Sequence, residues 1–406
     1  MKYIIDIQDL WPEAFCMVLP YNWMRLLMKP IEWYANRIYQ AADAIVAVSE
    51  TYVHRGISVN QKVDKGLCFY LGNDGHLFDE SKIKFATRRA EGELWIAYVG
   101  TLGHSYDLDC AIDAIAIAQR QLGDGARLKF VIIGDGPLME RFKAHAQEQN
   151  VYCDFVGRLA YPEMVGLMCS CDMVINPIMH DAAQSITNKV GDYALSGLPV
   201  INTQECPEYR ELVETYQCGI NCRCGDAEDV AKAIRRLAMD RLLRERMGMN
   251  ARRLGVERFD RRITYGHLAD MVETQAGKDG EIMIISNFVD TIDYEAKDRF
   301  VYLAEMLAER GCQVELITSD FNHTLKRHAV SIKGDFKSKI TFIHEPGYTT
   351  NVCLRRLYSH WIWGRNVAKY LAAKNQKPSC IYAAVPSLTV NNQIVSYCHE
   401  YPRLHS

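Results

Sequence analysis

The residues best suited to chemistry follow apolar runs that end in glycine. Segment 96–107 (IAYVGTLGHSYD) ends one run at Gly100, and segment 129–137 (KFVIIGDGP) ends another at Gly134. Glycine permits tight turns and close approach of a ligand, and the amides at the start of a following helix attract phosphate. An ordinary helix capped by Ser105 fits the first segment equally well. The candidate ligand-binding residues of these two segments are Gly100, Thr101, Gly103, His104, Ser105, Gly134 and Asp135.

Two further segments add a candidate base contact and a charged helix start. Segment 154–177 places Arg158 in a turn where it can stack on a base, although a loop arginine is usually just solvated. In segment 181–202 a polar loop leads into a helix. Lys189 at its start suits a diphosphate, and Asp192 one turn later can accept ribose hydroxyls, or simply complement the helix dipole. The same segments contribute Gly157, Thr187 and Asn188 as candidate nucleotide contacts.

Short β-rich runs that alternate with longer helical runs must position these residues. Such alternation is typical of parallel sheets covered by helices, so we expect an α/β fold. The predicted strands are Tyr3–Ile7, Ala44–Val48, Leu94–Val99, Leu128–Ile133, Tyr152–Phe155, Met173–Ile175, Pro199–Asn202, Glu281–Ser286, Gln313–Thr318, Lys339–His344 and Ser379–Ala384. The predicted helices are Asp107–Gln121, Pro137–Glu148, Ala227–Met239 and Asp298–Arg310.

Length, net charge and cysteine content indicate a two-domain protein of the cytoplasm rather than a nucleic-acid-binding, secreted or membrane-spanning one. A chain of 406 residues suits two domains, and a net charge of −3 gives no basic field for nucleic acid. The start of the chain lacks the long apolar region and small-residue cleavage site of a signal peptide, so we expect none, and no apolar run is long enough to span a membrane. The 14 cysteines therefore predict free thiols in the cytoplasm rather than disulfides. The Cys-x-Cys pairs at 169/171 and 222/224 lack a zinc pattern, so we predict no metal ligands.

One discontinuity divides the chain unexpectedly. Residues 273–281 (ETQAGKDGE) are polar and contain two glycines, as a linker would. The strand, loop, helix and strand after residue 281 have the form of the βαβ unit that normally opens a Rossmann-like domain. The usual opening unit therefore stands late in this chain.

Taken in order, the motifs resemble the donor-binding domain of the retaining family-four glycosyltransferases, which have the GT-B fold. YVGTLGHSYDL, FVIIGDGP, VYCDFVGRL and NKVGDYALSGLPVI carry the resemblance within residues 83–265. YIIDIQDLWPE and ADAIVAVSE resemble the second half of the acceptor domain, and residues 281–400 resemble its first half. The resemblance implies two Rossmann-like domains with parallel sheets facing a cleft. One is donor-binding (83–265); the other is an acceptor-side domain split in circularly permuted order (1–80 with 281–406), and 273–281 is the linker.

The family implies retaining, metal-independent transfer of a hexosyl unit from a nucleotide diphosphate sugar to an acceptor hydroxyl, without a cofactor. Lys189 would then neutralise the leaving diphosphate. Asp192 takes the place of the second acid in the family's Glu-x₇-Glu motif, and Gln184 falls where the first acid would stand, with Asp181 as a nearby substitute. Thr101 occupies the place of the family's usual arginine. Asp9, at the end of a strand, is the candidate acceptor-side or sugar-side group, or else a turn residue.

The expected partners are the nucleotide-sugar donor and a saccharide or lipid-linked saccharide acceptor, as in polysaccharide or glycolipid assembly. Segment 11–39 has three tryptophans among aliphatic and basic residues, which suits either peripheral contact with the cytoplasmic membrane face or a pair of core helices. Two alternatives stay open: a nucleotide-sugar epimerase of the same architecture, and a non-catalytic partner subunit of a glycosyltransferase. The sequence does not identify the base, sugar, acceptor or linkage.

Overall fold

The computed structural model describes residues 1–10, 13, 22–88, 90–180, 186–277, 279–289, 292–293, 298–351, 353–385 and 387–400. They belong to two compact units. Unit 1 combines Met1–Phe69 with Tyr265–Ser406, and unit 2 is Tyr70–Thr264. Each unit is an α/β structure on a parallel sheet, as the alternation of apolar runs predicts.

Unit 1 has a seven-stranded parallel sheet in the order β16-β12-β10-β17-β1-β2-β3. Its main strands are β1 (Lys2–Ile7), β2 (Ala44–Ala47), β3 (Leu67–Cys68), β10 (Ile282–Ile285), β12 (Val314–Ser319), β16 (Lys339–Ile343) and β17 (Cys380–Val385). Short strands outside this sheet are β11 (Ile292–Asp293), β13 (Phe321–Asn322), β14 (Arg327–His328) and β15 (Ile332–Lys333). Its helices are α2 (Asn22–Ala41), α3 (Glu50–Ile57), α12 (Arg261–Ala276), α13 (Arg299–Glu309), α14 (Leu354–Ala373) and α15 (Leu388–Glu400).

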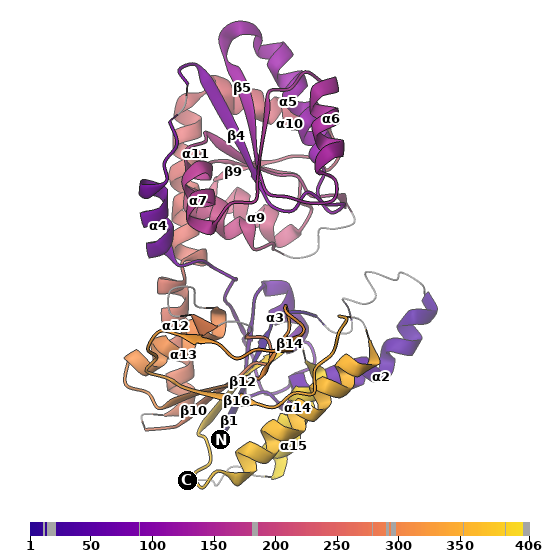
Figure 1. Cartoon of the computed structure of the whole chain (residues 1–406), viewed down its shortest axis with the longest axis vertical. Coiled ribbons are helices and arrows are strands. Elements are labelled where there is room, and N and C mark those ends of the chain that lie inside the picture. The colour runs from indigo at the N-terminus through magenta and orange to yellow at the C-terminus, as the bar shows by residue number, and fades with distance from the viewer. Residues whose placement is uncertain are drawn as a thin grey trace. The chain divides into compact units, whose positions relative to one another are not determined.

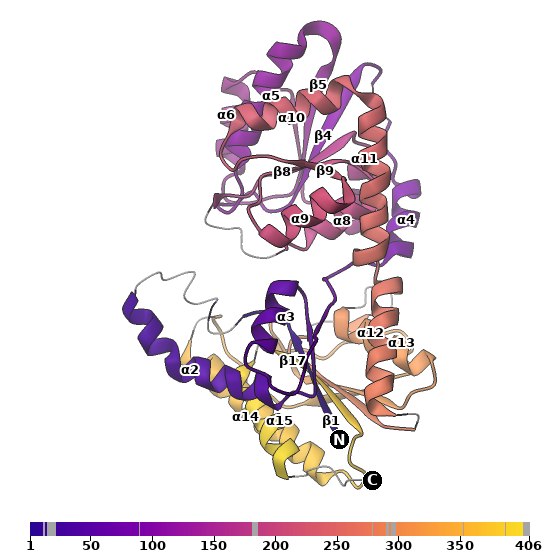
Figure 2. The same cartoon turned by 180° about the vertical axis from the view of Figure 1, so that it is seen from behind.

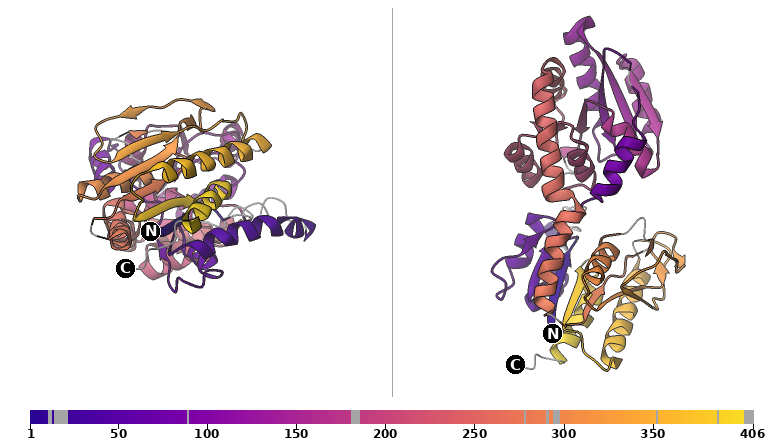
Figure 3. Two further views of the ribbon diagram at one scale, coloured as in Figure 1. Left: turned by 90° about the horizontal axis from the view of Figure 1, so that it is seen from below. Right: turned by 90° about the vertical axis from the view of Figure 1, so that its left-hand side faces the viewer.

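Strands from both ends of the chain lie together in the unit 1 sheet. β17 pairs with β10 on one side and with β1 on the other, so Cys380 faces both Ile282 and Lys2. The right-hand view of Figure 3 shows the indigo start of the chain beside a yellow strand from near its end. Counted from β10 through β17 and then from β1 to β3, the strands follow the doubly wound order 3-2-1-4-5-6-7. Ser406, which a circularly permuted order would place near Met1, lies outside the described residues.

Helices cover both faces of this sheet. α2, α14 and α15 bury their apolar sides on one face, and α12 and α13 cover the other, as Figures 1 and 2 show from opposite sides. A buried ion pair joins distant parts of the chain: the Nε of Arg299 donates to Asp6 at 2.7 Å, and Tyr382 donates its hydroxyl to the same carboxylate at 2.8 Å. The beginning of the chain is thus fastened to its C-terminal third by packing, hydrogen bonding and charge.

Two expected boundaries need correction. The linker predicted from residue 273 is helical as far as Ala276, because Leu268 and Val272 recur one turn apart on α12 and pack into the core of unit 1. The split also falls after Phe69 rather than after residue 80. The following helix, α4 (Gly75–Lys84), packs against α7 in unit 2.

Unit 2 has a six-stranded parallel sheet in the order β6-β5-β4-β7-β8-β9, which is the Rossmann order 3-2-1-4-5-6. Its strands are β4 (Glu93–Val99), β5 (Arg127–Ile133), β6 (Cys153–Gly157), β7 (Met173–Asn176), β8 (Val200–Asn202) and β9 (Gly219–Asn221). Besides α4, its helices are α5 (Leu108–Leu122), α6 (Met139–Glu148), α7 (Tyr161–Cys169), α8 (Lys189–Ser196), α9 (Pro207–Tyr216), α10 (Ala227–Met239) and α11 (Arg241–Leu254). α5, α6 and α10 pack on one face of the sheet, and α7, α8 and α11 on the other.

Candidate active site

The glycine turns predicted after β4, β5 and β6 lie side by side at the carboxyl edge of the unit 2 sheet. The amide of Gly100 donates to Ile133 at 3.0 Å, and that of Gly134 donates to Gly157 at 2.9 Å. A Cβ atom at Gly134 would lie 1.9 Å from the carbonyl oxygen of Gly100. Close packing of one turn on another therefore already demands glycine at 134, whereas the sequence analysis explained this glycine by the approach of a ligand.

The loop after β4 crosses to the end of β7. The carbonyl oxygen of Ser105 accepts a hydrogen bond from the amide of Met179 at 3.1 Å. Asp107, not Ser105, caps α5, and its carboxylate accepts from the amide of Cys110 at 3.1 Å. The alternative interpretation of Ser105 as a cap is therefore wrong. Gly103 is half-buried, and the exposed candidates in this loop are Thr101, His104 and Ser105.

The remaining polar candidates of unit 2 differ in exposure. Asp135, Arg158 and Asn188 are exposed, and Asp135 bonds to the next amide in its own turn at 2.7 Å. The hydroxyl of Thr187 is buried and finds no hydrogen-bond partner among the described residues. Gln184, proposed for the sugar hydroxyls, lies outside the described residues, as does its substitute Asp181.

Lys189 is a buried cation at the start of α8. The residue is 8% exposed, and none of the described residues offers its ammonium a hydrogen-bond acceptor. The Nζ atom lies 4.6 Å from the ring centre of Tyr98 and 4.0 Å from that of Tyr106. A Cβ atom at Gly100 would lie 3.6 Å from it, so the ammonium faces the first glycine turn. Burial lowers the pKa of Lys189 well below its usual value, because the ammonium is desolvated and no anion compensates its charge among the described residues.

Asp192 lies one turn further along α8 and is part of a polar network. Its Oδ1 accepts hydrogen bonds from the Tyr161 hydroxyl at 2.9 Å and from the Asn73 side-chain amide at 2.8 Å. Burial raises its pKa to about 7, although the bond from Tyr161 and the charge of Arg261 oppose the rise. Asp192 therefore changes charge near neutral pH, and its ionised form is the better acceptor for two hydroxyls.

Asp9 belongs to unit 1, whereas the other described candidates belong to unit 2. It follows β1 at the carboxyl edge of the unit 1 sheet, and its side chain is exposed. Surrounding protein atoms still desolvate the carboxylate in part and raise its pKa, and the guanidinium of Arg356 opposes this rise.

The carboxyl edge of the unit 1 sheet also holds buried polar groups that sequence reasoning missed. Glu345 accepts from the hydroxyls of Ser319 at 2.7 Å and Ser359 at 2.8 Å. Burial lowers the pKa of the neighbouring His360 to about 3, so this imidazole is neutral at physiological pH. Within the described parts of the chain, five buried polar atoms here lack a hydrogen-bond partner: Gln8 Nε2, Ser286 Oγ, Asn287 Nδ2, Thr318 Oγ1 and His360 Nε2. Because buried polar atoms in proteins normally have hydrogen-bond partners, these atoms indicate a site where a polar ligand could supply them.

In unit 2 the residues missed are those that surround Lys189 and Asp192. Tyr98 and Tyr106 flank the first glycine turn, a spacing that could have drawn attention to them. Asn73 is 119 residues from its partner Asp192 in the sequence, so no local pattern could predict that the two side chains meet.

Residues 79–254 match the family model of glycosyl transferases group 1. The match covers less than half of the chain and lies within unit 2, where the glycine turns, Lys189 and Asp192 are found. Comparison with curated protein sequences finds no match.

Solved structures with similar folds include HepE from Anabaena in complex with UDP, at 19% identity and a TM-score of 0.47 over 57% of this chain and 64% of HepE. Sucrose-phosphate synthase from Thermosynechococcus elongatus is similar at 17% identity and a TM-score of 0.49, over 66% and 67% of the two chains. The catalytic domain of the Helicobacter pylori cholesterol-alpha-glucosyltransferase matches at 19% identity and a TM-score of 0.35, over 40% and 98%. This chain thus spans less than two thirds of the length of HepE. Likeness of this degree does not identify a substrate.

Segment 11–39, considered for membrane contact, is only partly described. In α2, Ala35, Ile38 and Tyr39 are buried in the unit 1 core, whereas Trp33 is 65% exposed. The side chain of Trp23 lies outside the described residues. Among the helices that the structure describes, none has the length and apolar character needed to cross a membrane.

Proposed function

We propose that the protein is a glycosyltransferase that moves a sugar from a nucleoside diphosphate sugar to an acceptor hydroxyl with retention of configuration. The buried ammonium of Lys189 carries this proposal. It lies at a helix start, faces the first glycine turn and has no acceptor among the described residues. A diphosphate placed there would supply the missing negative charge. The family match of unit 2 is independent support.

Charge development explains why a cation belongs at this point. As the bond between the sugar and the diphosphate breaks, negative charge grows on the leaving phosphate oxygen, and a preorganised cation stabilises it more than it stabilises the intact donor. Lys189 is preorganised because its stem is buried and its ammonium lies between two tyrosine rings. The acceptor oxygen bonds to the sugar carbon, and its proton passes to the leaving diphosphate. This chemistry requires no metal ion.

Asp192 and Gln184 complete the donor contacts of the proposal. Ionised Asp192 would accept the ribose hydroxyls, and Gln184 would hold hydroxyls of the transferred sugar. Exposed Arg158 is available to stack on the base. The exposed loop residues Thr101, His104 and Ser105 would contact the phosphates or the sugar.

We assign the acceptor to unit 1. A saccharide has many hydroxyls, which can pair with the unsatisfied polar atoms of Ser286, Asn287 and His360 at the carboxyl edge of its sheet. Asp9 at the same edge would orient the acceptor or the sugar. Exposed Trp33 on α2 supports peripheral contact with the cytoplasmic membrane face and hence a lipid-linked acceptor, as in polysaccharide or glycolipid assembly.

We also interpret the chain order as a circular permutation. The doubly wound strand order of unit 1 begins at β10 and continues from β17 to β1, across the two chain ends. Met1 and Cys398 pack against the same apolar core. Burial raises the pKa of Cys398 to about 12, and the nearby N-terminal ammonium opposes this rise. The start of β1 and the end of α15 are therefore neighbours, as this interpretation requires.

The experiment begins with thermal unfolding in the presence of UDP, GDP, ADP, CDP or TDP. A nucleotide that binds only the folded state raises its stability, by about 2.7 kcal/mol at a hundred times Kd. The sugar derivative of the stabilising nucleotide is then incubated with saccharide acceptors, and the product's anomeric configuration is read by NMR. Stabilisation followed by transfer with retention supports the proposal. If no diphosphate stabilises the protein, the assignment of unit 2 is wrong.

A further inference from the structure

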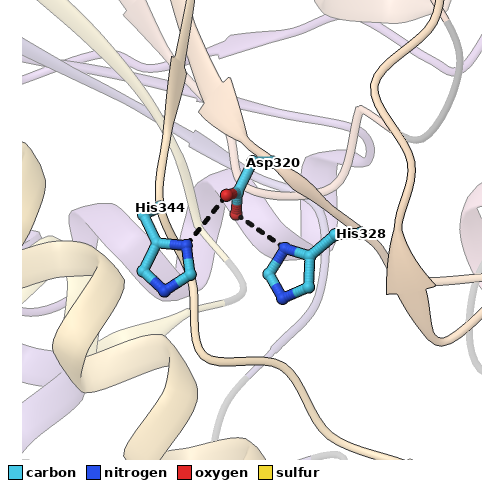
Figure 4. Close-up of side chains that lie close together, drawn as sticks. All are labelled: Asp320, His328 and His344. Carbon is cyan, nitrogen blue, oxygen red and sulfur yellow. Dashed lines mark hydrogen bonds and ion pairs between the residues drawn. The ribbon is translucent and has the colours of Figure 1, made fainter.

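Two histidines and one aspartate converge on the exposed carboxyl edge of the unit 1 sheet. Asp320 follows β12, His344 follows β16, and His328 belongs to β14 in the short hairpin after β12. Figure 4 shows that both imidazole rings turn a nitrogen toward the single carboxylate. The Nδ1 of His344 lies 2.9 Å from one carboxylate oxygen, and that of His328 lies 3.3 Å from the other. One ligand atom from each residue lies within 4.8 Å of the other two.

These separations fit a transition-metal ion. Zinc bonds to nitrogen and oxygen are about 2.0–2.2 Å long, so neighbouring ligands of a tetrahedral site stand roughly 3.3–3.5 Å apart. The observed 2.9 and 3.3 Å, which run to different oxygens of Asp320, need to open by only a few tenths of an ångström. The ligand nitrogens of the two histidines lie within 4.8 Å of each other. Two imidazoles with one carboxylate favour zinc and similar metals over magnesium and calcium, which take oxygen ligands almost exclusively.

The surrounding structure holds the three side chains in place. The amide of Glu345 donates to Oδ1 of Asp320 at 2.8 Å and orients the carboxylate. The rings of His328 and His344 stack with centres 5.4 Å apart and planes 15° apart, and Phe321 packs its ring against His328 at 5.5 Å. Hydrogen bonds and packing around the ligand side chains orient metal ligands in proteins in this way. The histidine side chains are 46% and 66% exposed, so an ion could enter directly from solvent.

We propose that Asp320, His328 and His344 bind a zinc-class divalent ion. Three protein ligands leave at least one coordination position to water or to an oxygen of a bound molecule. The ion would fasten the β13–β14 hairpin to the ends of β12 and β16. The site belongs to unit 1 and shares no residue with the candidate donor-binding set of unit 2, so this proposal stands whether or not the protein transfers sugars.

The competing explanation is an ion-pair cluster without metal, in which each histidine donates a hydrogen bond to Asp320. Calorimetric titration of chelator-treated protein with ZnCl₂ separates the two explanations. We expect one site that His344→Ala or Asp320→Asn weakens by about tenfold or more. His145→Ala is the matched control, because His145 pairs with Asp113 at 2.7 Å but no third potential ligand joins them among the described residues. Zinc should also raise the unfolding temperature of the wild type more than that of the triad variants.

The absorption spectrum of the protein with Co²⁺ in place of zinc tests whether the ion is bound instead by any of the 14 cysteines. Nitrogen and oxygen ligands give visible d–d bands without the intense near-ultraviolet charge transfer of a thiolate ligand. A thiolate band would overturn the proposal, because it would place the ion on cysteines. Equal zinc affinity in the wild type and in both triad variants, or no zinc binding by the wild type, would also overturn it.

Discussion

Replacing Lys189 with methionine should stabilise the free protein and abolish its response to nucleotide. Methionine has a similar length and suits a buried site, but it has no charge to desolvate. The lysine is 8% exposed, burial lowers its pKa well below the usual value, and none of the described residues accepts a hydrogen bond from it. The wild type therefore retains a destabilising group whose benefit comes only with an anion.

The size of the effect follows from opposing contributions. A buried polar group without a partner costs about 1–3 kcal/mol. The rings of Tyr98 and Tyr106, at 4.6 and 4.0 Å, offset part of this cost, by about 0.5–1 kcal/mol each. We therefore expect Lys189→Met to gain about 0.5 kcal/mol, or roughly 1–2 °C in Tm for a unit of this size. Saturating nucleotide should reverse the order, since about 2.7 kcal/mol at a hundred times Kd goes to the wild type alone.

The dependence on pH gives a second measure. A lysine whose folded pKa is depressed weakens the folded state fully below that pKa, and the deficit disappears as pH rises toward the unfolded value of 10.5. The advantage of Lys189→Met in the free protein should shrink as pH is raised, and should not grow.

Thermal and urea unfolding with and without nucleotide provide the assay. Lys129→Met is the matched control, because Lys129 is also buried but pairs with Asp154 at 2.9 Å. That variant should lose stability and keep the response to nucleotide. The reasoning is refuted if Lys189→Met is less stable than the wild type without ligand yet still shifts with nucleotide, because the lysine would then be structural.

Three further changes test other parts of the structure. The pKa of Asp192 is about 7, so nucleotide-sugar affinity measured by calorimetry should rise between about pH 6 and about pH 8. Asp192→Asn should remove this rise. If the affinity of the variant still rises over this pH range, the assignment is wrong. Burial alone would raise the pKa of Glu315, but hydrogen bonds from Lys374 and its neighbours lower it to about 2. Glu315→Gln should therefore cost about 1–3 kcal/mol in urea unfolding at neutral pH, and the difference should vanish as pH falls from about 4.5 toward about 2; a difference that persists in acid would contradict the pairing. Arg299→Met leaves the Asp6 carboxylate buried without its cation, and should lower the free energy of unfolding by about 3–5 kcal/mol. The double variant with Asp6→Leu should recover part of this loss. An equal loss of stability in the single and the double variant would show that the pair is not coupled.

Apolar periodicity was sufficient to predict the main strands of both sheets. β5, for example, is buried at every position after Arg127, and its apolar run Phe130–Ile133 predicts a strand covered on both faces. The same reasoning missed β3 and β9, because two or three residues are too few to show a period. It also assigned residues 273–276 to a linker, although the apolar spacing of α12 continues the helix toward the unit 1 core.

The candidate site divides in the same way. The sequence alone suggested Lys189 and Asp192 as candidates, because a lysine and an acid at a helix start after a polar loop form a local pattern. It did not place the ammonium between Tyr98 and Tyr106, join Asp192 to Asn73, or bring the Asp320 triad together. A local pattern records how one element is buried. Which distant side chains meet depends on strand order and on the path of the loops, and both arise only when the elements pack against one another.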